Sequence, residues 1–165
     1  MIPSKNILSI VQNDWTQDGG FDLAVLYSAE AKPDQTNLRL YVSASGNLVT
    51  FVTLENAAWQ GAMAGTAATL TLNAAGSLVV NSGNESIGRH RWNQKLTIAW
   101  RNNTFVVAGF TYIARDTLDP NYSLECDVNL LNGRGIKNGK NFKLAHRAPT
   151  LGEWIADWVS EICIQ

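Results

Sequence analysis

The sequence is short of charged residues, of histidine and of long apolar runs, and each shortage excludes a class of function. Charged side chains make up 16% of the 165 residues, against about 25% in ordinary soluble domains. The formal net charge of −1 provides no basic field for nucleic acid or anionic lipid. No stretch approaches the roughly 20 apolar residues of a membrane helix. We therefore expect no nucleic-acid partner and no membrane insertion.

Residue types that carry catalysis are equally sparse. The two histidines are His90, between Arg89 and Arg91, and His146, beside Arg147. Neither has partners at the spacing of a metal site. The G-x-S-x-G, H-E-x-x-H and P-loop motifs are absent. The sequence therefore predicts no catalytic residue and favours a protein that is not an enzyme.

The two cysteines, Cys126 and Cys163, form an even pair, and Cys163 lies two residues from the C-terminus. A disulfide between them would tie down the chain end and stabilise the fold by about 4 kcal/mol in the chain-entropy model. The alternative is two separate buried thiols in a cytosolic protein. Low charge and Asn-rich loops favour the disulfide, which implies an oxidising compartment. We expect a periplasmic or secreted protein whose leader is absent from this chain, because residues 1–5 are too polar for a signal peptide.

Apolar residues recur mainly with a period of two, which is typical of half-buried strands. Leu38, Leu40 and Val42 share one face of such a run, and Gly109 marks a bulge or close backbone approach in another. Turn residues separate the runs, including Ser45-Gly46-Asn47 and Asn138-Gly139. The pattern predicts strands at residues 7–11, 21–28, 38–43, 48–54, 78–81, 92–100, 105–114, 124–131 and 142–144.

These strands predict an all-β protein with two packed antiparallel meander sheets, arranged as a sandwich or as propeller-like blades. Residues 6–55 would form the N-terminal sheet and residues 77–145 the C-terminal sheet, joined by a small, flexible stretch at 60–66. Each half is too small to fold alone, so we expect a single domain over residues 1–165. Helical spacing after a Thr150/Glu153 capping box predicts a short helix over about residues 151–160.

One loop has the composition of a calcium site. Residues 14–22 place oxygen-bearing side chains at relative positions 1, 3, 5 and 9 and glycine at position 6. Calcium requires six to eight oxygen ligands from such a tight loop, including a backbone carbonyl at position 7. The alternative is a loop closed by Asx turns. The spacing predicts bound Ca²⁺ with five ligand residues: Asp14, Thr16, Asp18, Gly20 and Asp22.

The D-x-T-x-D-G-x-x-D pattern, followed by Leu-Ala-Val-Leu, resembles the calcium hairpin of FG-GAP/VCBS-type repeats. The resemblance covers about residues 11–27 and implies that the ion braces a hairpin. Thr16 replaces the usual Asp or Asn, and no second copy of the motif is present, which excludes a full propeller. Residues 111–135 resemble small exported proteobacterial proteins that have no assigned activity.

The best surface candidate for ligand binding is Arg89, His90, Arg91 and Trp92. Guanidinium groups beside an aromatic ring suit a sugar or an acidic partner. The alternative is a long hairpin loop with Trp92 turned inward.

The favoured function is an exported, non-catalytic domain that binds a protein or a cell-envelope glycan and is braced by Ca²⁺. One alternative is a hydrolase of carbohydrate or peptidoglycan that uses Asp116, Asp119 or Asp127. The other alternative is a structural module of a surface assembly.

Overall fold

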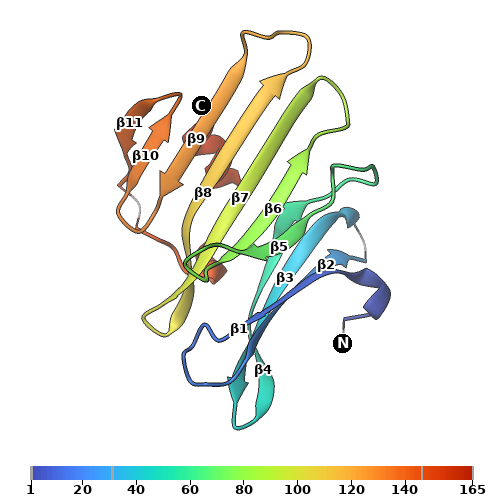
Figure 1. Ribbon diagram of the computed structural model, residues 1–165, viewed down its shortest axis with the longest axis vertical. Helices are drawn as coiled ribbons and strands as arrows, with labels where there is room; N and C mark the ends of the chain where they lie inside the picture. The colour runs from blue at the N-terminus through green and yellow to red at the C-terminus, as the bar shows by residue number, and fades with distance from the viewer. Residues whose placement is uncertain (1, 31, 146, 165) are drawn as a thin grey trace.

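A computed structural model describes residues 2–30, 32–145 and 147–164. It contains two antiparallel sheets and a short C-terminal helix, and this confirms the predicted fold class. Figure 1 shows the larger sheet face-on, with the smaller sheet at its lower end. In both sheets each strand pairs with the strand that precedes it in sequence, so each sheet is a simple meander.

The smaller sheet contains β1 (Ile7–Asn13), β2 (Asp22–Ala29), β3 (Lys32–Ala44) and β4 (Asn47–Trp59), in that order. The turn between β3 and β4 places Ser45 and Gly46 at positive φ, 50° and 79°. Positive φ at both central residues is the conformation whose twist matches the flanking strands. The predicted turn at this position is therefore confirmed.

The larger sheet has seven strands: β5 (Thr69–Leu72), β6 (Leu78–Asn84), β7 (His90–Arg101), β8 (Thr104–Asp116), β9 (Ser123–Asn129), β10 (Arg134–Lys137) and β11 (Lys140–Lys143). Two of them, β5 and β10, were not expected from sequence because four residues are too few to show a clear alternation. The predicted Asn-Gly turn joins β10 to β11, with Asn138 and Gly139 at φ 45° and 76°.

The core lies between the two sheets. Leu26 and Leu38 of the smaller sheet and Leu96, Ile98 and Phe110 of the larger sheet are each at most 2% exposed. We call the face of the larger sheet that carries Leu96, Ile98 and Phe110 the inner face, and the opposite face the outer face. Successive residues along a strand alternate between these faces, and directly paired residues on neighbouring strands share one.

Gly109 is the close approach that the sequence predicts. The register between β7 and β8 shifts beside it, because Thr97 pairs with Gly109 whereas Ile98 pairs with Val107. A Cβ atom at position 109 would stand 2.3 Å from the carbonyl oxygen of Val128 on β9. Only glycine therefore allows β8 and β9 to pair at this point.

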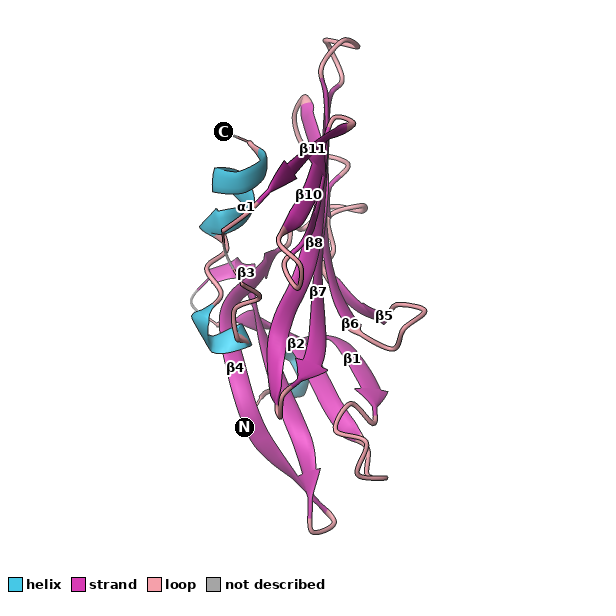
Figure 2. Ribbon diagram, turned by 90° about the vertical axis from the view of Figure 1, so that its left-hand side faces the viewer, coloured by secondary structure: helices cyan, strands magenta, loops and turns pink. Residues whose placement is uncertain are grey.

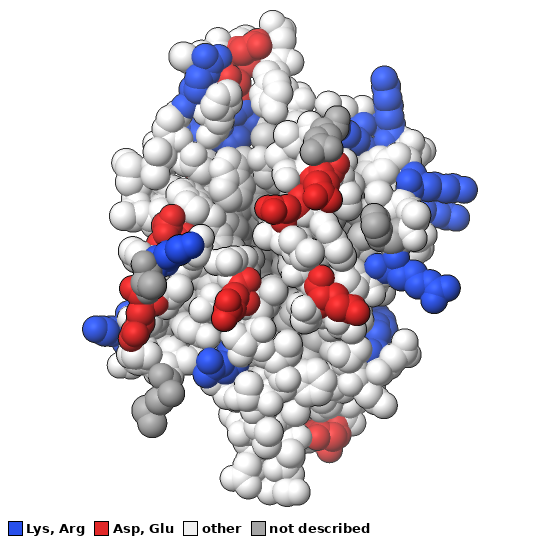
Figure 3. All heavy atoms as spheres, turned by 180° about the vertical axis from the view of Figure 1, so that it is seen from behind, with Lys and Arg blue, Asp and Glu red and all other residues white. Residues whose placement is uncertain are grey.

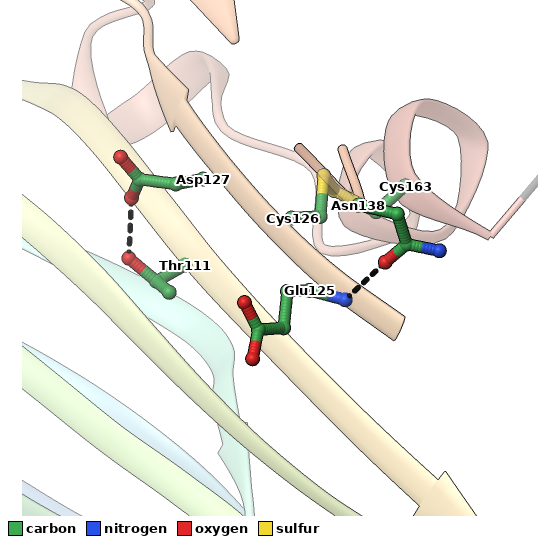
Figure 4. The surroundings of a disulfide bond; sticks show 6 residues. All are labelled: Thr111, Glu125, Cys126, Asp127, Asn138 and Cys163. Atoms are coloured by element: carbon green, nitrogen blue, oxygen red, sulfur yellow. Dashed lines mark hydrogen bonds between the residues drawn. A yellow bond between two sulfur atoms is a disulfide. The ribbon is translucent and has the colours of Figure 1, made fainter. Parts of the chain in front are cut away.

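The C-terminal segment differs from the single helix predicted over residues 151–160. A 3-10 turn, Leu151–Glu153, is followed by extended backbone at Trp154, and the helix α1 covers Asp157–Cys163. The break places the Trp154 ring against Phe110, with centroids 5.9 Å apart, so core packing overrides the helical spacing. The predicted Cys126–Cys163 disulfide then fastens α1 to β9 (Figure 4).

Other elements of the fold cover the larger sheet on one side only. In the side view, α1 and the end of β4 lie on the same side of the larger sheet (Figure 2). Seen from that side, the surface is hollowed near its middle (Figure 3). Within the described residues, no helix is long and apolar enough to span a membrane.

Candidate functional site

The loop predicted to bind calcium is organised around Asp22, which is 0% exposed. One carboxylate oxygen accepts hydrogen bonds from the backbone N–H groups of Trp15 and Thr16, at 2.8 and 3.0 Å. The other oxygen accepts the N–H of Ser43 on β3, at 3.0 Å. Asp22 therefore holds both ends of the loop to the smaller sheet.

The remaining carboxylates of the loop are also engaged by backbone donors. The oxygens of Asp14 accept the N–H groups of Asp18 and Gly19, at 3.2 and 3.0 Å. Asp18 accepts the N–H of Gly20 at 2.8 Å and the hydroxyl of Ser43, and these bonds lower its pKa. This is the Asx-turn arrangement, in which the loop closes through its own hydrogen bonds.

In this structure all three carboxylates of the loop accept hydrogen bonds from backbone N–H groups. Among the described residues, no three or more His, Cys, Asp or Glu side chains are grouped so that they could hold a metal ion. To coordinate an ion, the carboxylate oxygens of Asp14, Asp18 and Asp22 would have to give up hydrogen bonds that they accept from backbone N–H groups. The calcium site stays a prediction.

The four residues predicted to bind ligand do not converge on one surface. Arg89 precedes β7 and holds Asp116, at the end of β8, through its Nε and Nη2 atoms at 2.8–2.9 Å. His90 lies near the same carboxylate, with Nδ1 3.6 Å from it. Arg89 therefore anchors the loop that precedes β7. His146 lies outside the described residues.

The ion pair predicts a change in acid stability. Hydrogen bonds from Arg89 and from the backbone N–H of Leu118 lower the pKa of Asp116 from 3.8 to about 2. A lowered pKa stabilises the fold above pH 3.8, and the contribution disappears as pH falls towards 2. Urea titrations between pH 4 and 2 should show that the wild type takes up more protons on unfolding than the Asp116→Asn variant, by at most about 0.8 of a proton, near pH 3. Identical pH profiles for the two proteins would contradict this role.

Arg91 points to the outer face, because its neighbour Trp92 points inward. It lies close enough to Glu85 to help lower the pKa of that carboxyl, although the main cause is the hydrogen bond from Arg115. Glu85 also accepts a hydrogen bond from Asn93 at 2.5 Å. The Nη1 atom of Arg91 is buried without a hydrogen-bond partner.

Trp92 belongs to a row of partly buried aromatic side chains on the inner face. Its ring is nearly parallel to that of Tyr112, with centroids 6.1 Å apart and an interplanar angle of 22°. Trp59, at the end of β4, contacts it from the smaller sheet at 5.7 Å. The row therefore joins the two sheets, and Gln94, which pairs directly with Tyr112, shares its face.

Two members of this row were missed from sequence. Trp59 and Tyr112 are remote in sequence from Trp92, and only the pairing of β7 with β8 and the packing of β4 bring the three together. The sequence offered one signal for Tyr112. In an alternating strand Trp92 and Gln94 point to the same face, and a hairpin with residues 105–114 would bring Tyr112 to that face as well. Trp59 carried no such signal.

Two of the carboxylates proposed for a hydrolase, Asp116 and Asp127, lie on opposite faces of the larger sheet. Asp116 follows Tyr112 by four residues on β8 and therefore points to the same, inner face. Asp127 pairs with Thr111 and points to the outer face. Asp119 accepts the backbone N–H of Asn121 within a turn. Asp116 and Asp127 therefore cannot flank one scissile bond, which a pair of glycosidase carboxylates must do.

Comparison of the chain with protein-family models, with curated proteins and with solved structures found no match.

Proposed function

We propose that this protein is an exported, non-catalytic binding domain that holds a neutral glycan on the inner face of its larger sheet. The observation that carries the proposal is the row Trp59, Trp92 and Tyr112, whose rings are partly exposed and in which Trp92 contacts both of the others. The flat apolar face of a sugar ring stacks on such rings, while their N–H and O–H groups bind hydroxyls.

The polar groups around the row suit sugar hydroxyls. Gln94 supplies both a donor and an acceptor beside the Tyr112 ring. The tyrosine hydroxyl is protonated at neutral pH and able to donate, and burial raises the pKa of Tyr112 further. Convergent neutral donors and acceptors beside apolar rings are typical of small-ligand sites.

The charge on this side of the molecule favours a neutral ligand over an anionic one. In Figure 3, several acidic side chains border the hollow, while Lys and Arg gather mainly at the right-hand edge of this view. An anionic glycan would be repelled by the nearest carboxylates. Arg89 is already paired with Asp116 and is therefore less available to bind an anion.

The disulfide supports export. Cys126 and Cys163 are 1% and 0% exposed, and their Cα atoms are 5.8 Å apart. Disulfides persist in the periplasm and outside the cell, whereas cytosolic thiols are kept reduced. A rigid, disulfide-fastened sheet is also a suitable support for a preorganised aromatic surface.

The Trp92→Ala variant should bind a glycan selected on an array at least tenfold more weakly than the wild type, because buried aromatic anchors commonly contribute 2 kcal/mol or more. Isothermal titration calorimetry measures the change. The matched control is Phe21→Ala, which removes an aromatic ring that is 66% exposed and outside the row. Equal affinities of the Trp92→Ala variant and the wild type would overturn the site, and capture of a periplasmic protein but no glycan would overturn the ligand class.

A further inference from the structure

The hairpin formed by β10 and β11 is the most basic part of the chain. Residues 134–147 contain five of the 13 Lys and Arg residues, and no Asp or Glu occurs between positions 128 and 152. Lys and Arg line the edge of the molecule at this hairpin in the view from behind (Figure 3). The whole protein has a net charge of −1, so this local excess of positive charge sets the hairpin apart from the rest of the chain.

Strand register divides these charges between the two faces. Arg134 pairs with Asn129 on β9 and with Lys143 on β11. Asn129 follows Asp127 by two residues on β9, so both side chains point to the same face. In Figure 4 the side chain of Asp127 points away from the Cys126–Cys163 disulfide. Arg134 and Lys143 therefore lie side by side on the outer face. Lys140 pairs with Lys137, which pairs with Cys126, so it belongs to the inner face.

A groove of about 500 Å³ follows the outer-face residues of this hairpin. Its lining includes two cations, two amides and an apolar side chain, namely Arg134, Lys143, Asn129, Asn141 and Ile136. The volume is within the range of small-ligand sites. Asn129 pairs directly with Arg134, and Asn141 lies two residues before Lys143 on β11, so an amide N–H donor lies near each cation.

The two cations are not engaged by the one carboxylate that lines the groove, that of Asp127. In the described part of the chain, neither Arg134 nor Lys143 forms an ion pair with a carboxylate. Like charges directly opposite each other on neighbouring strands destabilise a sheet. Edge lysines do protect sheets from pairing with other strands, and this accounts for Lys143 on the edge strand β11. It does not account for Arg134, because β10 is flanked by strands on both sides.

The carboxylate of Asp127 limits the groove at its other end. It accepts the hydroxyl hydrogen of Thr111 at 2.6 Å, and it pairs across the strands with neither cation (Figure 4). Its charge disfavours an anion next to Ile136. The favourable position for negative charge is therefore the row Asn129, Arg134 and Lys143.

We propose that this groove is a second binding site, for an oxyanion group such as a sulfate, phosphate or carboxylate, with Arg134 and Lys143 as its cations. The planar guanidinium binds two oxygens of the group, and the ammonium of Lys143 neutralises its charge. Ile136 offers an apolar contact to whatever carries the oxyanion. The site lies on the face opposite the aromatic row and is independent of the proposed glycan site.

Titration of the full-length protein with three carriers tests the site: inorganic sulfate, a sulfated oligosaccharide with its desulfated counterpart, and vesicles containing phosphatidylglycerol. Binding of at least one carrier should weaken about tenfold in Arg134→Ala and in Lys143→Ala, because each removes a charge-assisted hydrogen bond. Affinity for that carrier should also fall with increasing salt.

The matched control is Lys140→Ala, which removes the same charge from the same hairpin but on the inner face. Retained affinity in this control supports the groove. Equal weakening in all three variants, or no binding of any carrier to the wild type, overturns the proposal. Trp92→Ala should leave binding of the oxyanion unchanged, so failure of the glycan site and failure of this site give different results.

Discussion

Replacing Asp22 with alanine is expected to lower the free energy of unfolding by about 4 kcal/mol, because it leaves buried backbone donors without acceptors. The N–H groups of Trp15, Thr16 and Ser43 all donate to this fully buried carboxylate. A loss of this size corresponds to a fall in melting temperature of roughly 10 °C for a domain of this length. Urea denaturation followed by circular dichroism measures the change.

The control is Asp18→Ala in the same loop, whose carboxylate is exposed and whose loss should cost less than about 1 kcal/mol. Thermal melting of the wild type in calcium and in chelator tests the calcium prediction. If the ion binds, saturating Ca²⁺ at about 100 times its dissociation constant should add about 2.7 kcal/mol. Melting curves that coincide in calcium and in chelator would contradict the calcium prediction without affecting that for Asp22.

Loss of the disulfide is the second large effect that we expect. The double variant Cys126→Ala/Cys163→Ala should be less stable by about 4 kcal/mol, because the bridge closes a loop with a sequence separation of 37 residues. The melting temperature should fall by roughly 10 °C. Differential scanning calorimetry of the variant and of the wild type, with and without reductant, measures both quantities.

Reduction of the wild type should reproduce the effect of the double variant, whereas reductant should leave the double variant unchanged. This comparison separates loss of the bridge from loss of the buried sulfur atoms. An unchanged melting temperature on complete reduction would show that α1 is held by the packing of Trp154 and Val159 alone.

The aromatic row and the basic groove depend on contacts between strands that the pattern of a single strand does not predict. Arg89, His90, Arg91 and Trp92 are adjacent in sequence and read as one surface. The alternation of β7 sends Arg91 and Trp92 to opposite faces, and Asp116 engages Arg89. The partners that give Trp92 its surroundings are Trp59 and Tyr112, on other strands. Contacts between strands depend on register, which a single sequence does not encode locally.

Local chemistry by itself determined the all-β class, the two meanders, the turns at Ser45-Gly46 and Asn138-Gly139, and the pairing of the two cysteines. These features depend on period-two burial, on positive φ and on the count of thiols, all of which act over a few residues or over the whole composition. Tertiary structure decided where the C-terminal helix begins, the closure of the Asp22 loop by hydrogen bonds, and the faces on which Trp92 and Arg134 meet their neighbours. Those outcomes depend on competition between distant groups for the same buried space and the same donors.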